Sequence, residues 1–364
     1  MAGAPLRYSS DVEQVQLDEA DTMKQLVETF RGIVDTTNKD FGHAFRSVHA
    51  KSHALLEGEL RVNEGLPPEL AQGIFAEGKR AYPVLLRLST NPGDPLPDTI
   101  SVPRGLAIKV IGVDGERLPG SENGNTQEFV LANGTAFQAP DAKHFLSSLK
   151  LLAATTDKAE GGKVAISALL RGTNKLLEAV GVESAKVKSL GGYPQTHPLG
   201  ERYFSQVPIR YGDHVAKAGV VPLSPNFKAL EGKELDIAGR ENGIREDVAA
   251  MLADQGGTFE FRVQLARDPA KNPIEDATVP WPEDDNPYVA VATITIAAQP
   301  GWTWDRSKVL DDQTGFAPWH GIVAHRPLGG IMRARRIYDD LSSYRATLNG
   351  CPIHNWTEPP RLPA

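Results

Sequence analysis

Apolar and polar residues alternate along several short stretches of the chain, which is the pattern of half-buried β-strands. Between residues 54 and 62, for example, Leu56, Gly58, Leu60 and Val62 alternate with charged neighbours. Residues 105–111 repeat the pattern, with Leu106, Ile108 and Val110 on one face. The alternation predicts strands at residues 54–62, 82–88, 105–111, 126–132, 203–211, 218–221, 257–266 and 288–297.

Other stretches have apolar residues at the three- and four-residue spacing of an amphipathic helix. Residues 11–38 follow this spacing, with Leu26, Phe30 and Ile33 on one side. The same criterion predicts helices at residues 141–155 and 165–179 and a helical C-terminal region around 331–344. Residues 91–98 and 268–286 are rich in Pro, Asp and Asn, which predicts loops.

Strands that follow one another without regular strand–helix alternation favour an antiparallel barrel with added helices, an α+β fold. The strand region has no clear break in composition, so we expect one barrel domain. We divide the chain into an N-terminal helical arm (1–40), a barrel domain with C-terminal helices (41–350) and a tail (351–364).

Composition narrows the class of protein. The chain has 364 residues, a net charge of −7 and 40% hydrophobic residues, which is typical of a soluble globular protein and gives no basic surface for nucleic acid. No apolar run approaches the roughly 20 residues needed to span a bilayer. The N-terminus lacks the apolar segment of a secretory signal, and Cys351 is the only cysteine. We therefore expect a cytoplasmic protein without a membrane span.

Four groups of residues follow in the order found in haem catalases. They are Arg46-Ser-Val-His49, Arg87-Leu-Ser89-Thr, residues 103–109, and Tyr338 with Arg345 seven residues later. The chain resembles this superfamily, and in length it is similar to its small catalase-related haem proteins. The resemblance implies an eight-stranded antiparallel β-barrel of catalase type with surrounding helices, and haem b as cofactor.

The resemblance also implies roles for individual residues. His49 would move the proton of the bound peroxide, and Ser89 would orient its imidazole. Tyr338 would ligate the iron. Arginine binds carboxylates bidentately, and three arginines match the positions that bind the haem propionates: Arg46, Arg87 and Arg345. Val48 would narrow the access over the haem, and Phe137 matches a Phe near the haem face.

The sequence departs from the family on the side of the tyrosine. Catalases place an Arg four residues before that Tyr, where this chain has Ala334. We hypothesise that Arg335 supplies the missing positive charge. The family also has an Asn that hydrogen-bonds the peroxide. Asn133 fits its place in the sequence, and Asn125 is the alternative.

We expect a haem peroxidase or catalase-like enzyme that reduces hydrogen peroxide or organic hydroperoxides with an electron donor. A shorter chain than in full-length catalases favours bulky organic hydroperoxides. Two alternatives stay open: an enzyme that rearranges fatty-acid hydroperoxides, like allene oxide synthases, and a non-catalytic haem-binding protein. The oligomeric state is also open, a homo-oligomer included. The segments around His320 and His325 look like structural turns.

Overall fold

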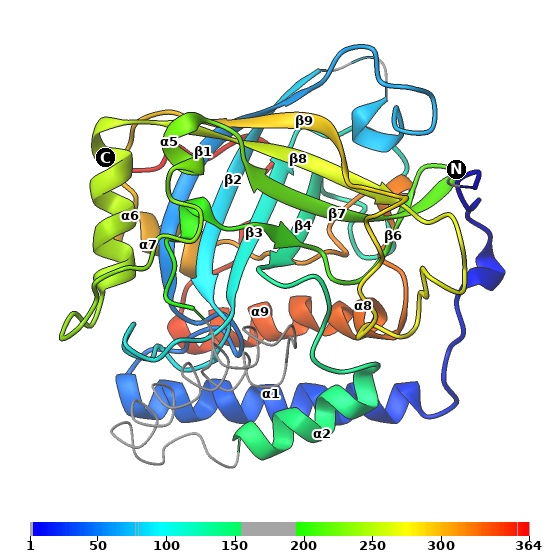
Figure 1. Ribbon diagram of the computed structural model, residues 1–364. Coiled ribbons are helices and arrows are strands. Elements are labelled where there is room, and N and C mark those ends of the chain that lie inside the picture. The colour runs from blue at the N-terminus through cyan, green and yellow to red at the C-terminus, as the bar shows by residue number, and fades with distance from the viewer. Residues whose placement is uncertain (1–2, 77, 79, 154–193, 355, 364) are drawn as a thin grey trace, which may run out of the picture.

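The structure is a computed structural model, and it describes residues 3–76, 78, 80–153, 194–354 and 356–363. The helix predicted at residues 165–179 lies outside the described residues. Within the described residues, nine strands form one antiparallel sheet (Figure 1). They are β1 (Ser52–Val62), β2 (Ala81–Thr90), β3 (Arg104–Ile111), β4 (Thr126–Ala132), β5 (Tyr203–Phe204), β6 (Ile209–Tyr211), β7 (His214–Pro222), β8 (Gly257–Leu265) and β9 (Val289–Ile296).

The sheet closes on itself. Neighbours along it run β5-β4-β3-β2-β1-β9-β8-β7-β6, and β5 also pairs with β7. That last pairing completes a ring of eight strands, β1-β2-β3-β4-β5-β7-β8-β9, so the predicted eight-stranded antiparallel barrel is confirmed. Closure leaves no free strand edges in the ring.

The strand predicted at residues 203–211 is wrong in one respect, because it is interrupted. Both β5 and β6 pair with β7, but the Tyr203↔Val220 and Ile209↔Ala216 pairings differ in register by two residues. Between the two strands, Gln206 takes a left-handed backbone conformation with φ of 62°. The Ser205 hydroxyl donates a hydrogen bond to the Val207 carbonyl. This local turn uses the residues that a continuous strand would have paired.

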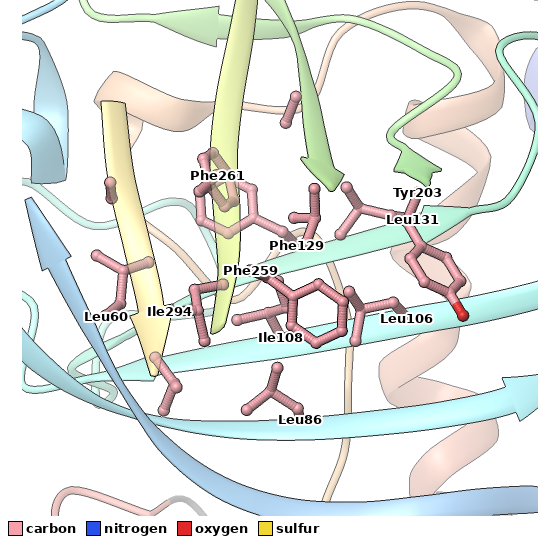
Figure 2. Close-up of a cluster of buried hydrophobic side chains, with 14 of the residues drawn as sticks. Leu60, Leu86, Leu106, Ile108, Phe129, Leu131, Tyr203, Phe259, Phe261 and Ile294 are labelled. Atoms are coloured by element: carbon pink, nitrogen blue, oxygen red, sulfur yellow. The ribbon is translucent and has the colours of Figure 1, made fainter. Parts of the chain in front are cut away.

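Alternate side chains of the strands fill the barrel, as the apolar pattern predicts. Figure 2 shows large side chains from several strands packed together at its centre. Leu106 and Ile108 from β3 meet Phe129 from β4 and Phe261 from β8 there, and all of them are buried. Apolar residues on the outer face of the barrel are also buried, since Leu55 and Leu85 pack against Leu310 and Leu362.

Three long helices cover the lower side of the barrel in Figure 1: α1 (Glu19–Phe41), α2 (Ala142–Ala153) and α9 (Tyr338–Asn349). Helix α1 begins eight residues later than predicted. The segment before it is held in another conformation, because Glu13 pairs with Arg333 and the Gln14 backbone N–H donates to Glu275. The division into arm, barrel domain and tail stays a prediction.

The other helices connect and flank the strands. Helix α6 (Gly243–Asp254) lies beside the barrel with α7 (Trp304–Ser307) (Figure 1) and was not predicted. The others are α5 (Pro225–Lys228) and α8 (Gly330–Ala334), the 3₁₀ turns η1 (Ser10–Val12), η2 (Gly73–Phe75), η4 (Pro198–Gly200), η6 (Val323–His325) and η7 (Arg335–Ile337), and the π-helical turn η5 (Lys308–Asp312). Among the described residues, none of these helices combines the length and the apolar character that a membrane crossing requires.

Candidate functional site

His49 lies three residues before β1 in a strained backbone conformation. Its φ is 54°, and Gln206 is the other non-glycine residue with positive φ in the described part of the chain. The conformation is held by a hydrogen bond from the His49 backbone N–H to the Asn91 carbonyl at 2.8 Å. Such strain costs of order 1–3 kcal/mol and occurs most often at functional sites.

The imidazole of His49 is fixed from two sides. Its Nδ1 atom lies 3.1 Å from the Ser89 hydroxyl oxygen, so the predicted Ser89–His49 pair is present. The ring also packs on Gly105, where an added Cβ would lie 2.5 Å from His49 Cε1. Gly105 and Ser89 are cross-strand partners in β3 and β2. The β2–β3 register therefore places the serine and the glycine together around one imidazole.

His49 is held in its neutral form. Burial, together with the positive charges of Arg87, Arg335 and Arg46, lowers the pKa of His49 to about 3. Because Nδ1 is engaged by the Ser89 hydroxyl, Nε2 is the ring nitrogen that can exchange a proton with a ligand. A neutral imidazole can accept a proton and return it.

Arg46, Arg87 and Arg345, which we call the arginine cluster, converge beside His49. Burial lowers the pKa of Arg46 well below its usual range, and the nearby charges of Arg345 and Arg87 contribute. Two acidic residues face the cluster: Arg87 Nε donates to Asp311 at 2.6 Å, and Arg345 Nη1 lies 3.6 Å from Asp312. The three arginines predicted to act together are therefore brought together.

The acidic partners come from the π-helical turn η5, a rare helix type that is frequent at functional sites. Burial alone would raise the pKa of Asp311, but Arg87 and Arg46 lower it to about 2. The same turn also supplies backbone acceptors, because Arg46 Nη2 donates to the Leu310 and Asp311 carbonyls at 2.8 and 3.0 Å. Neither Asp311 nor Asp312 was predicted as a site residue.

The arginine cluster keeps unused capacity for an anion. Three guanidinium groups face two carboxylates, which leaves one positive charge in excess. Arg46 Nε and Arg345 Nη2 are buried and have no hydrogen-bond partner in the part of the chain that the structure describes. An unsatisfied buried donor costs about 1–3 kcal/mol. A ligand that carries carboxylates would satisfy these donors and balance the charge.

Tyr338 is the first residue of α9, and Arg345 lies two helical turns further along the same helix. The Tyr338 side chain is half-buried. It packs against a cluster of buried apolar side chains outside the barrel, to which α1, α2 and α9 contribute. Val48, the neighbour of His49, packs against the same cluster. Tyr338 and the predicted access residue Val48 are thus part of one apolar region, and ligation of iron by Tyr338 stays a prediction.

Asn133 immediately follows β4 and is buried in a polar network. Its side-chain oxygen accepts the Arg104 backbone N–H at 2.8 Å, and its amide nitrogen donates to the Glu201 carboxylate. Glu201 also forms an ion pair with the Arg104 side chain. The amide group therefore has a structural role, and its contact with a peroxide stays a prediction.

The alternative residue Asn125 precedes β4 at the other end of the strand. Its amide donates to the Thr357 carbonyl at 2.8 Å. Ala132, at the far end of β4, pairs with Gly105, which packs on His49. Of the two candidates, Asn133 is therefore the one at the end of β4 where His49 lies.

Phe137 and Arg335 are in contact with each other. The Arg335 guanidinium lies 5.9 Å from the centre of the Phe137 ring, which in turn packs on Phe145 at 5.3 Å. Arg335 belongs to η7, directly before Tyr338, and its Nη1 atom lies 3.5 Å from Met332 Sδ. Its charge acts on His49, while the hypothesis that it favours the Tyr338 phenolate stays untested.

A second buried polar network, not predicted from the sequence, lies next to Tyr338. His320 Nε2 lies 2.7 Å from Asp339, and Nδ1 lies 3.1 Å from Glu128, which also pairs with Lys109. Through these ion pairs the network connects the start of α9 to β3 and β4. Within the described residues, no group of three or more His, Cys, Asp and Glu side chains could hold a metal ion.

The fold matches those of solved catalases. Catalase A from Saccharomyces cerevisiae has a TM-score of 0.59 and 16% sequence identity, over 96% of this chain and 70% of that one. A fungal catalase gives 0.59 and 15%, over 98% and 69% of the two chains. The chain has a catalase-like fold. A bacterial catalase gives 0.57 and 16%, over 95% and 66%. No protein-family model and no curated protein matches the chain.

Proposed function

We propose that the protein is a haem-dependent, catalase-like peroxidase that reduces hydrogen peroxide or organic hydroperoxides at the expense of an electron donor. The observation that carries the proposal is the convergence of the His49–Ser89 pair with the arginine cluster and its two unpartnered buried N–H groups. The catalase-like fold supports it as well.

The residues present fit haem b. Its two propionates would meet the arginine cluster, where Arg46 Nε and Arg345 Nη2 lack partners and one positive charge is in excess. The planar guanidinium suits carboxylate better than a lysine would. Tyr338 would ligate the iron through its phenol oxygen, one of the known modes of haem ligation. The bound haem would supply the electrons that cleave the O–O bond.

The polypeptide would handle the proton. His49 is neutral, so it can take the proton from the hydroperoxide O–H and return it to the departing oxygen. The Ser89 hydroxyl and Gly105 hold the imidazole in one orientation, which keeps the second ring nitrogen in a constant position. In this proposal Asn133 would position the peroxide, and Val48 would narrow the access to it.

The test begins with an absorption spectrum of protein expressed with a supply of haem. We expect a high-spin ferric spectrum that is lost or altered in Tyr338→Phe. Tyr344→Phe is the matched control, since Tyr344 lies on the same helix but its hydroxyl donates to the exposed Asp35. A protein without a Soret band, or one in which both variants behave like the wild type, would refute the assignment.

Peroxide assays then separate the possible functions. A peroxidase oxidises an added donor with hydrogen peroxide or cumene hydroperoxide, and His49→Gln lowers the rate by about 10²–10⁴-fold. Consumption of a lipid hydroperoxide without any reductant would indicate a rearranging enzyme instead. Haem binding with no turnover that depends on His49 would indicate a haem-binding protein without catalysis.

A further inference from the structure

Two tryptophans in the segment that follows β9 form an aromatic pair at the molecular surface. Trp304 is 75% exposed, the largest exposed aromatic side chain among the described residues. Its ring centre lies 4.9 Å from that of the half-buried Trp302, with an edge-to-face angle of 71°. The two rings together present a solvent-accessible indole that is in direct contact with a partly buried one.

The pair is held rigidly. The buried Arg306 donates to the Leu55 and Pro300 carbonyls at 2.9 and 2.6 Å. The Gly301 carbonyl accepts the Leu55 backbone N–H at 2.8 Å. These bonds fix the segment against β1 on both sides of Trp302, so the exposure of Trp304 is not the result of a loose loop.

Trp302 is joined to the arginine cluster by three successive hydrogen bonds. Its indole N–H donates to the Ser52 hydroxyl at 2.8 Å, and Ser52 donates to Asp311 Oδ2 at 2.7 Å. Asp311 Oδ1 accepts the bond from Arg87 at 2.6 Å. One ring contact and three hydrogen bonds therefore lead from the exposed Trp304, through Trp302, to the groups that would hold the haem carboxylates.

The two rings differ in how easily they lose an electron. The Arg245 guanidinium is stacked 3.6 Å from the centre of the Trp302 ring and is anchored by hydrogen bonds to the Ser52 carbonyl. A cation on the ring face is attracted to the electrons of the ring, so oxidation of Trp302 forfeits that attraction. Trp304 is solvated and water stabilises a positive charge on it. An electron deficiency passed outward would thus come to rest on Trp304.

We propose that Trp304 is a surface site at which bulky aromatic electron donors are oxidised, with Trp302 as the relay to the haem. The inference rests on the proposed function. A hydroperoxide takes up two electrons and two protons when its O–O bond is cleaved, giving water and an alcohol, or two waters. Two phenols at Trp304 supply these two electrons, one at a time, and the electrons pass inward through Trp304 and Trp302. Each phenol releases its proton to water and becomes a phenoxyl radical.

The first experiment locates the oxidised residue without measuring turnover. Haem-loaded protein is treated with hydrogen peroxide and a nitroso spin trap, and the adduct is mapped by mass spectrometry. We expect the adduct on Trp304 in the wild type and its loss from this position in Trp302→Phe. Trp356→Phe is the control, because Trp356 also reaches the cluster region, through Thr314, but packs on His354 rather than on an exposed indole.

The second experiment compares two donors, free phenol and a phenol coupled to dextran that is too large to enter the protein. In Trp304→Phe we expect the ratio of the dextran-phenol rate to the free-phenol rate to fall at least tenfold. An unchanged ratio, or an adduct that depends on Trp356 instead, overturns the proposal. The haem spectrum distinguishes the causes of failure: if peroxide leaves it unchanged, the proposed function fails; if it changes without labelling Trp304, the relay alone is wrong.

Discussion

Replacement of His320 by Gln should remove a pH-dependent contribution to stability. Burial alone would lower the pKa of His320, but the carboxylates of Glu128 and Asp339 raise it from 6.5 to about 10. The folded protein therefore binds this proton more tightly than the unfolded chain does. The contribution is complete below about pH 6.5, decreases as the pH rises, and is lost above about pH 10.

The size of the effect follows from the same values. The interval between 6.5 and about 10 corresponds to an upper limit of about 5 kcal/mol, at about 1.4 kcal/mol per pH unit. The His320 side chain keeps 20% of its surface exposed and Asp339 43%, so solvent screens part of the interaction. We expect a loss of about 2–3 kcal/mol at pH 6, or roughly 3–4 °C in melting temperature for a chain of this size.

The assay is thermal unfolding of wild type and His320→Gln, followed by circular dichroism, at intervals from pH 6 to pH 10.5. The difference between the two melting temperatures should shrink steadily and approach its minimum at the upper end. His144→Gln is the control, since His144 forms an exposed pair with Asp141, and exposed pairs contribute little. A difference that is the same at pH 6 and pH 10.5 would refute the assignment of a charged His320.

Three further predictions concern the site. Gly105→Ala should displace the His49 ring, because the new Cβ would lie 2.5 Å from Cε1; we expect at least a tenfold loss of peroxide turnover with haem affinity retained, measured by steady-state kinetics and haem titration. Arg345→Met should weaken haem binding about tenfold or more, measured by the same titration. The melting temperature of the haem-free protein should change little, because Asp312 keeps its closer partner His43 at 3.0 Å. Arg104→Met should lower the free energy of unfolding by about 3–5 kcal/mol in denaturant titrations, because it leaves the Glu201 carboxylate buried and uncompensated.

The barrel could be predicted because its signal is local. In β1 and β3 the residues that point into the barrel are apolar at every second position, and Leu60, Leu106 and Ile108 are buried as expected. Helix α6 was missed, although Ile244, Val248 and Leu252 recur at four-residue spacing and are all buried. Three positions on a 12-residue helix make a narrow stripe, which is a weak signal beside the clearer pattern of α1.

The polar environment of the site could be predicted only in part. Arg46, Arg87 and His49 were recognised through a resemblance in sequence, and the structure brings them together. Asp311 was not recognised, because its role depends on a π-helical turn, and the spacing of apolar residues does not predict such a turn. The role of Asn133 in the Arg104–Glu201 network depends on a contact across 68 positions of sequence. Long-range polar contacts of this kind follow from the closed fold and not from local pattern.

One cross-strand pair explains why the two parts of the site are coupled. Ser52 of β1 faces Ser89 of β2, at a point where the β1–β2 register shifts between Ser52 and Ala54. Ser89 contacts His49, while Ser52 links Trp302 to Asp311. A slip of one residue in either strand would turn the serine of that strand to the opposite face of the sheet. The register of two strands thus determines at once the orientation of the imidazole and the path to the surface tryptophans, and a variant that alters it should disturb both together.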